Sequence, residues 1–147
     1  MGEHQMQEAL LQAWMAMEVC IRGNRLLSDL SMNEMLICNT LYGRRQGAPV
    51  TATELCAKTQ LLKSQMNRIL TSMEEQGLIR RERDSRDKRA VWVYLQEAAL
   101  PRYLQEHDRV LGIVDRVCGA LGETDAKQLS ELMCKAAYIV SNLKEEP

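Results

Sequence analysis

Six basic side chains lie within ten consecutive residues near the middle of the chain: Arg80, Arg81, Arg83, Arg86, Lys88 and Arg89. Lys and Arg bind phosphate oxygens and displace counterions from nucleic acids, so this cluster is a candidate phosphate-binding surface. An arginine at the tip of a hairpin can also enter a minor groove, because narrow A·T tracts have a strongly negative potential. Asp84 and Asp87 lie among the basic residues, and we expect them to hold neighbouring guanidinium groups in one orientation. The alternative is a charged loop that only protects an edge strand.

A second group of polar side chains lies upstream, on one side of a predicted helix: Lys63, Ser64, Gln65, Asn67, Arg68 and Thr71. In a DNA major groove Arg pairs with guanine, Asn or Gln pairs with adenine, and Ser or Thr contacts either base. The opposite side of the same helix is apolar at spacing i, i+3, i+4, i+7 and comprises Met66, Ile69, Leu70 and Met73. This pattern favours the second, base-reading helix of a helix-turn-helix. An ordinary solvated helix face is the alternative.

Capping signals predict where the neighbouring helices begin. Ser31 with Glu34 forms a capping box, and Thr51 with Glu54 forms a second one. Pro101 is tolerated only in the first turn of a helix, which places the start of a long helix near residue 98. We expect helices over residues 5–27, 32–43, 51–59 and 98–121. Another helix begins at residue 63 and stops at Gly77, and a last one follows a cap at Thr124. Strands are expected over residues 78–83 and 91–95.

Apolar stripes on the outer helices predict a partner surface. The long helix carries a heptad seam: Leu100, Leu104, His107, Leu111, Val114, Cys118 and Leu121. At 1.5 Å per residue this helix is about 35 Å long, which is more than the small central domain can cover. We therefore expect a mainly α fold with a small β-hairpin wing. Residues 31–97 would form a winged helix-turn-helix DNA-binding domain, and residues 1–30 and 98–147 a helical dimerisation region.

Charge and composition restrict the function classes. Between Arg44 and Arg89 the chain has eleven basic and six acidic residues, whereas the whole chain carries a net charge of −1. A basic segment between acidic flanks is typical of a nucleic-acid site. The sequence shows no nucleophile–base pair, phosphate-binding glycine loop or cluster of metal-ligand residues. We therefore expect that the protein is not an enzyme and that it binds no cofactor and no metal.

The cysteines and the hydropathy pattern indicate the compartment. There are five cysteines, an odd number without a CxxC pair, which argues against a disulfide framework or a zinc site. No apolar run approaches the roughly 20 residues that cross a bilayer, and the polar first twelve residues are no secretory signal. We expect a cytoplasmic protein with no membrane association.

The motifs of the central segment resemble those of the MarR family of bacterial transcription regulators. The resemblance rests on Glu54-Leu55-Cys56-Ala57, Leu62-Lys63-Ser64, Met73 through Arg81, Asp84-Ser85-Arg86-Asp87-Lys88-Arg89 and Val93-Tyr94-Leu95. It covers residues 31–96 by motif and the whole chain by helix order. It implies a homodimer formed by the first, fifth and sixth helices, with Arg89 in the minor groove and Asp87 orienting the wing. The chain departs from the family where Gln96-Glu97-Ala98-Ala99 follows Leu95.

The resemblance also implies an effector, because many family members respond to small aromatic ligands between the dimer helices and the DNA-binding lobe. The residues that would line such a pocket are Trp14, Met17, Ile21, Met35, Cys38 and Tyr42, and the alternative is that they are simply core. Cys20 falls on the apolar stripe of the first helix, so we expect it to be buried and not a redox sensor. With only His4 and His107, the chain does not resemble the metal-sensing branch.

Two segments, Ile21 to Arg25 and Leu30 to Met35, are similar to the fatty-acid-synthesis repressors of the family, whose effector is acyl-carrier protein. The leading hypothesis is a sequence-specific regulator, more often a repressor than an activator, that binds a pseudo-palindromic operator as a homodimer. The competing hypothesis is a winged-helix adaptor that binds proteins and has lost DNA binding. The basic wing favours the regulator, because an adaptor has no need of six basic residues there.

Overall fold

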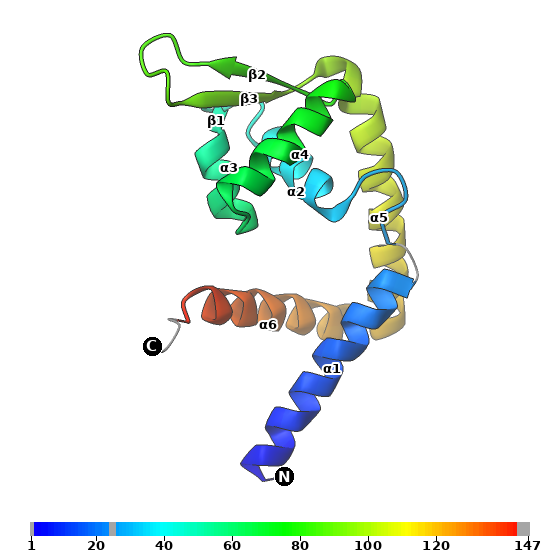
Figure 1. Cartoon of the computed structure of the whole chain (residues 1–147). Coiled ribbons are helices and arrows are strands. Elements are labelled where there is room, and N and C mark those ends of the chain that lie inside the picture. Colours follow the sequence, from blue (N-terminus) through cyan, green and yellow to red (C-terminus); the bar gives the residue numbers. More distant parts are fainter. Residues whose placement is uncertain (1, 24–25, 144–147) are drawn as a thin grey trace. The chain divides into compact units, whose positions relative to one another are not determined.

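A computed structural model describes residues 2–23 and 26–143 of the chain, which divides into two compact units, residues 1–107 and 108–147. The fold is mainly helical with one small sheet, as predicted (Figure 1). The elements are α1 (Glu3–Gly23), α2 (Met32–Gly43), β1 (Val50–Thr51), α3 (Ala52–Thr59), α4 (Lys63–Glu75), β2 (Ile79–Arg83), β3 (Val91–Leu95), α5 (Leu100–Leu121) and α6 (Glu123–Ser141), with a 3₁₀ turn at Glu97–Ala99.

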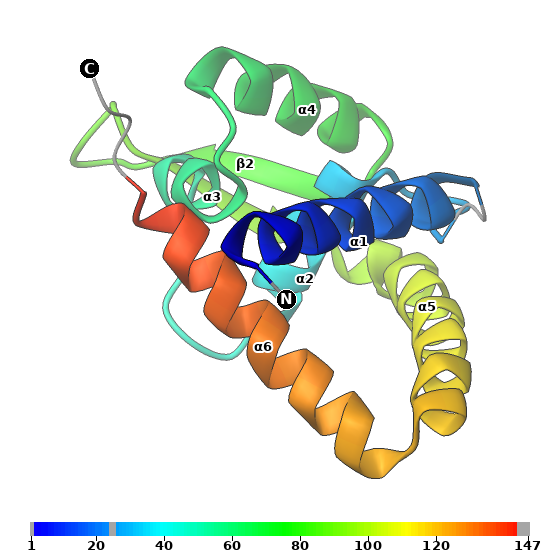
Figure 2. The same ribbon diagram turned by 90° about the horizontal axis from the view of Figure 1, so that it is seen from below.

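The sheet has three antiparallel strands in the order β1-β3-β2. In the predicted hairpin, Ile79 pairs with Leu95 and Arg83 with Val91, and α4 lies beside β2 (Figure 2). Strand β1 was not predicted, because two residues directly before a helix cap show no alternation. It pairs with the far side of β3 and therefore fixes the start of α3 against the sheet.

The core of the first unit collects one face from each element of the central domain. Its largest fully buried side chains, apart from Cys38, are Tyr103, Ile37, Leu55, Met66, Leu70, Met73, Leu78, Ile79 and Val93. Three of the four apolar positions predicted for α4 are buried, and Ile69 packs against the core from a partly buried position. The phenol of Tyr103 donates to Asn39 Oδ1 at 2.8 Å, which satisfies its hydroxyl inside the core. This packing is what holds α3 and α4 against the sheet.

Helix caps agree with the sequence in part. At α2 both halves of the capping box form, with Glu34 N–H donating to Ser31 Oγ at 3.1 Å and Ser31 N–H to Glu34 Oε1 at 2.9 Å. At α3 only the Thr51 half forms, because the Glu54 carboxylate pairs with Arg44 at 2.6 Å instead.

Three predicted helix ends were wrong. Helix α1 ends at Gly23, and Leu26 and Leu27 lie outside it, whereas residues 24–25 are outside the described part of the chain. Helix α5 starts at Leu100 after the 3₁₀ turn rather than at residue 98. Helix α6 is capped by Gly122 rather than Thr124, since the φ of +87° at Gly122 turns the chain sharply and starts the helix earlier. It ends at Ser141.

Several helices present uncovered apolar side chains. No residue of α1 or of α6 is buried in the single chain. On α5 beyond residue 107 and on α6 the exposed large apolar side chains include Leu111, Val114, Val117, Leu121, Leu132, Met133, Ile139 and Val140. Within the residues described, no helix is long and apolar enough to span a bilayer.

Candidate nucleic-acid interface

The turn between α3 and α4 is tight and uses a left-handed residue. Gln60 has φ 58° and ψ 25°, a conformation that non-glycine residues adopt only uncommonly. Its side-chain amide donates to the Ala57 carbonyl at 2.7 Å, which supports the end of α3. Helix α4 begins three residues later, at Lys63, and Leu55 and Met66 anchor the two helices in the same core. Helices α3 and α4 therefore form a helix-turn-helix, as predicted.

The solvent face of α4 carries all six polar residues that the sequence identifies, and each is exposed: Lys63, Ser64, Gln65, Asn67, Arg68 and Thr71. Gln65 also caps its own helix, because its Oε1 accepts the Leu62 N–H at 3.1 Å. The polar face is densest in the first turn and a half, where free backbone N–H groups favour an anion.

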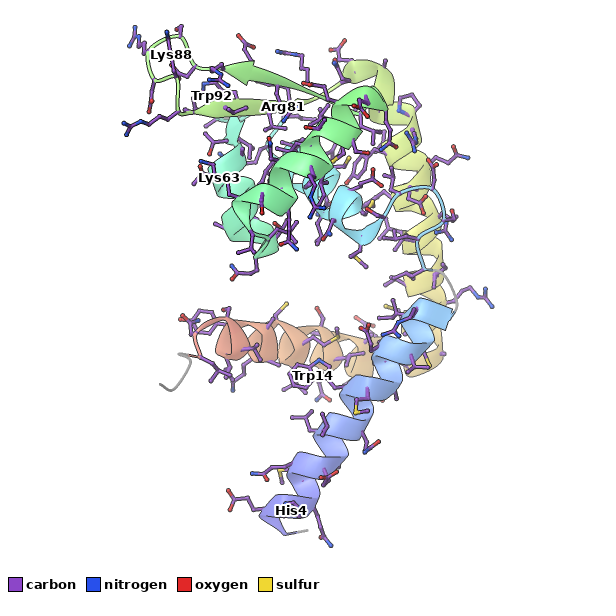
Figure 3. All side chains as sticks on the ribbon, in the orientation of Figure 1. His4, Trp14, Lys63, Arg81, Lys88 and Trp92 are labelled. Carbon is purple, nitrogen blue, oxygen red and sulfur yellow. The ribbon has the colours of Figure 1, made fainter. Side chains whose placement is uncertain are left out.

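Arg81 joins the hairpin to this face of α4. Its guanidinium donates from Nη1 to Asn67 Oδ1 at 3.1 Å and from Nη2 to Thr71 Oγ1 at 3.1 Å and Glu74 Oε1 at 3.2 Å. Its backbone N–H donates to Glu74 Oε2 at 2.9 Å. These hydrogen bonds from Arg81, with the backbone N–H first, lower the pKa of the Glu74 carboxyl. Arg81 lies between the hairpin and α4 and is not at the wing tip (Figure 3).

The C-terminal end of α4 is fixed by a second polar network. The Gln76 side chain donates to Glu34 Oε2 at 2.9 Å and accepts from Arg102 at 3.3 Å. Arg102 in turn forms two hydrogen bonds to Asp29, the shorter at 2.7 Å, and this pairing raises its pKa. The C-terminal end of α4 is thus held by side chains from other elements.

One carboxylate organises the wing loop between β2 and β3. Asp84 Oδ1 accepts the backbone N–H groups of Arg86 at 2.7 Å and Asp87 at 3.1 Å, and its Oδ2 accepts Trp92 Nε1–H at 3.0 Å. The same three bonds, the one from Arg86 first, lower the pKa of Asp84. Asp87 Oδ1 accepts the Arg89 N–H at 3.0 Å.

The expectation that these aspartates hold guanidinium groups was wrong, since the bonds formed go to backbone N–H groups and to an indole. An Asp followed two residues later by a free N–H makes an Asx turn, which uses up the carboxylate locally. Arg86, Lys88 and Arg89 are exposed on this turn, and Figure 3 shows Lys88 at its tip.

A cleft of about 960 Å³ lies between α3, α4 and the hairpin. Its basic lining residues are Lys63, Arg81, Arg83 and Arg89. The acidic residue that lines it, Glu74, already pairs with Arg81. The cleft therefore has a positive rim, and apolar side chains such as Met66 and Val91 form part of its wall.

The six residues proposed to line a ligand pocket fall into two sets. Met35, Cys38 and Tyr42 belong to α2, where Cys38 is fully buried and the other two pack against the core. Burial raises the pKa of the Cys38 thiol to about 12. Trp14, Met17 and Ile21 are exposed on α1.

Cys20, expected to be buried, is exposed in the single chain, because α1 buries none of its residues. Of the segment similar to the fatty-acid-synthesis repressors, Asn24 and Arg25 lie outside the described residues. The same holds for residues 1 and 144–147 of the predicted dimerisation region.

Two structural roles were not assigned from the sequence, those of Arg81 and Asp84. A signal for the first was present, because Ile79, Arg81 and Arg83 alternate along one face of a strand whose first member is buried. Arg80 lies on the other face, where it pairs with Glu82 at 2.9 Å and stacks on Tyr94. The signal for Asp84 was its spacing from Arg86.

Comparison with known proteins agrees with this architecture. The sequence model of the MarR family matches residues 28–90. The transcriptional regulator BldR from Sulfolobus solfataricus superimposes with a TM-score of 0.69 at 22% identity, over 97% of this chain and 100% of BldR. The transcriptional regulator PA4135 gives a TM-score of 0.69 at 25% identity over 90% and 96% of the two chains. NadR in complex with 4-hydroxyphenylacetate gives 0.66 at 22% identity over 90% and 92%. No curated protein sequence matches the chain.

Proposed function

We propose that the chain is a MarR-family homodimeric regulator of transcription that binds double-stranded DNA at a specific sequence, which the match of the MarR family model to residues 28–90 supports. The observation that carries this proposal is that the polar start of α4 and the basic hairpin border one positively rimmed cleft. In a helix-turn-helix, the second helix places its N-terminal residues against base edges in the major groove. The proposed contacts are Lys63, Ser64, Gln65, Asn67, Arg68 and Thr71 on α4, and Arg86, Asp87, Lys88 and Arg89 on the wing.

The two proposed functional regions have the boundaries that the sequence predicts. Residues 31–97 bind DNA, and residues 1–30 and 98–147 form the dimer. Support for the dimer comes from the apolar side chains that α1, α5 and α6 leave exposed in the single chain, such as Leu111 at 51% and Leu132 at 63% exposure. Apolar surface on this scale on several helices favours burial against another subunit.

The operator of a two-fold dimer is a pseudo-palindrome with half-sites about 34–36 Å apart. The chain acts in the cytoplasm, as a repressor that a small ligand releases from DNA. NadR with 4-hydroxyphenylacetate supports an aromatic ligand as the first class to test, and the proposed pocket is Trp14, Met17, Ile21, Met35, Cys38 and Tyr42. A ligand releases DNA only by binding one dimer geometry better than the other. The family and the regulators that this chain resembles indicate a transcription factor without enzymatic activity.

DNA binding is tested by selecting bound fragments from fragmented genomic DNA with the purified full chain. We expect one pseudo-palindromic motif to be enriched. Fluorescence anisotropy on that motif should then show weaker binding for Arg68→Ala, and little change for Arg22→Ala, which pairs with Glu18 on the exposed face of α1. If no fragment is enriched and no duplex binds, the regulator hypothesis fails and the adaptor hypothesis is favoured.

The dimer is tested by analytical ultracentrifugation of Leu111→Glu, which places a carboxylate on the apolar face of α5. We expect a shift toward monomer and a loss of operator binding, because a monomer offers only one reading helix. Lys127→Glu is the matched control, since it adds an acidic residue at an exposed polar position of α6. A monomeric unmodified protein that binds the operator fully would refute the homodimer.

A further inference from the structure

The two amide side chains on the reading face of α4 have their oxygen atoms occupied within the protein. Gln65 Oε1 accepts the Leu62 N–H at 3.1 Å, and Asn67 Oδ1 accepts Arg81 Nη1 at 3.1 Å. The orientation of each amide is fixed by chemistry, because a backbone N–H and a guanidinium can only donate. An amide turned the other way would place two donors face to face. Both side chains therefore present their NH₂ groups outward.

This orientation changes which base each amide can read. Bidentate pairing with adenine needs an oxygen to accept from the adenine amino group and an NH₂ to donate to N7. The carbonyl oxygen has a second lone pair, but the Arg81 guanidinium beside the Asn67 oxygen repels another donor. Guanine presents two neighbouring acceptors, O6 and N7, and no donor on that edge. An outward NH₂ thus fits guanine better than adenine.

Arg81 is well anchored in this role. Besides Asn67 it bonds to Thr71 and to Glu74 by side chain and backbone, and its side chain is 22% exposed. The Thr71 hydroxyl donates to the Asn67 carbonyl at 2.9 Å while accepting from Arg81, so both of its usual roles are filled inside the protein. Thr71 then positions Asn67 more than it contacts DNA.

We propose that Arg81 is a positioning residue for Asn67, and that the Leu62 N–H plays the same part for Gln65, so that both amides present donors and the bases opposite them are guanines. This inference rests on the proposed function, since it specifies the bases that the same site reads. Lys63 and Arg68 add donors without acceptors and share the preference. Of the six proposed contacts on α4, Ser64 and Thr71 alone carry hydroxyls that can also accept, and Thr71 is committed internally.

The first test is selection of bound sequences from random duplexes with the full-length dimer and three variants. The unaltered protein should select guanine at the positions opposite Gln65 and Asn67. Arg81→Met removes the donor and should admit adenine at the Asn67 position, whereas Arg81→Lys retains a donor and should preserve guanine. Arg80→Met, on the opposite strand face, should leave the preference unchanged. A guanine preference that survives at the Asn67 position in Arg81→Met would overturn the role of Arg81.

The second test uses modified bases and the unaltered protein, so it does not depend on how any variant folds. Replacing a selected guanine by 7-deazaguanine removes its N7 acceptor and should weaken binding by about tenfold. Placing adenine or purine, which lacks the 6-amino group, opposite Gln65 or Asn67 should give equal affinities, because neither amide accepts from that amino group.

The outcomes separate this inference from the proposed function. Specific binding to adenine at both positions, weakened by loss of the 6-amino group, would overturn the inference and leave the regulator intact. Binding without base preference at these positions would overturn it as well. Failure to bind any duplex would instead refute the proposed function itself.

Discussion

Removal of the two wing arginines that the Asx turn displays should flatten the salt dependence of operator binding by a calculable amount. Arg86 and Arg89 are exposed, and the carboxylates beside them are committed to backbone N–H groups and the Trp92 indole. Their guanidinium groups are therefore available to displace counterions from DNA. The variant Arg86→Ala with Arg89→Ala removes two such charges from each subunit and four from the dimer.

The magnitude follows from counterion release. The slope of log K against log salt changes by about 0.9 for each lost contact to B-DNA, so four contacts reduce it by about 3.6 and a monomer would show about 1.8. Between 50 and 200 mM salt the unaltered dimer should lose roughly 150-fold more affinity than the variant. The slope thus reports both the wing contacts and the number of subunits bound.

The assay is fluorescence anisotropy of a labelled operator at several salt concentrations. Arg80→Ala is the control, because Arg80 pairs with Glu82 and stacks on Tyr94, and its slope should match that of the unaltered protein. Trp92 fluorescence checks that the wing remains folded, since the indole bonds to Asp84 at the base of the loop. If affinity falls equally at every salt concentration, the arginines do not act on phosphates and the reasoning is refuted.

Four further predictions concern the parts that support this surface. Asp84→Ala should weaken operator binding at constant salt although it makes the wing more basic, because the loop loses its hydrogen bonds; tighter binding would contradict this. Folding lowers the pKa of Asp84 from its ordinary value of 3.8, so the ionised carboxylate keeps the wing ordered above pH 3.8. The wing should lose this order as the pH falls through the folded pKa of Asp84. Trp92 fluorescence, measured in the variant Trp14→Phe, can follow the loss. Cys38, with its pKa raised to about 12, should resist alkylation at pH 8 until denaturant is added, and mass spectrometry showing label in the native protein would oppose its burial. Leu55→Ala should lower the free energy of unfolding by about 3 kcal/mol in denaturant titrations, and a loss below about 1 kcal/mol would show that α3 is loosely packed.

Much of the fold was predictable because its signals are local. The 3.6-residue period of Met66, Leu70 and Met73 and the capping box at Ser31 act within a few residues, and the structure confirms both. The start of α6 was mispredicted, since the choice between Gly122 and Thr124 depends on the turn that follows α5. A two-residue strand such as β1 has no pattern of its own and exists only by pairing with β3.

The candidate site was predictable as a set of residues but not as a set of hydrogen bonds. The exposed polar face of α4 follows directly from helix periodicity. Arg81 turns toward α4 because of its position in the strand. A list of basic residues does not show that position, whereas the alternation of side chains along the strand does. The bonds of Asp84 depend on the conformation of the whole loop, where backbone N–H groups lie closer than any guanidinium.

The simultaneous placement of α4 and the wing on one duplex is tested most directly by photocrosslinking. A photoreactive amino acid at Ser64 in one preparation, and at Lys88 in another, is illuminated on the selected operator and the crosslinked nucleotides are mapped. The account predicts crosslinks from position 64 within each half-site and from position 88 in the flanking minor groove, repeated symmetrically about the operator centre. Crosslinks from both positions to the same nucleotides, or from neither, would contradict it.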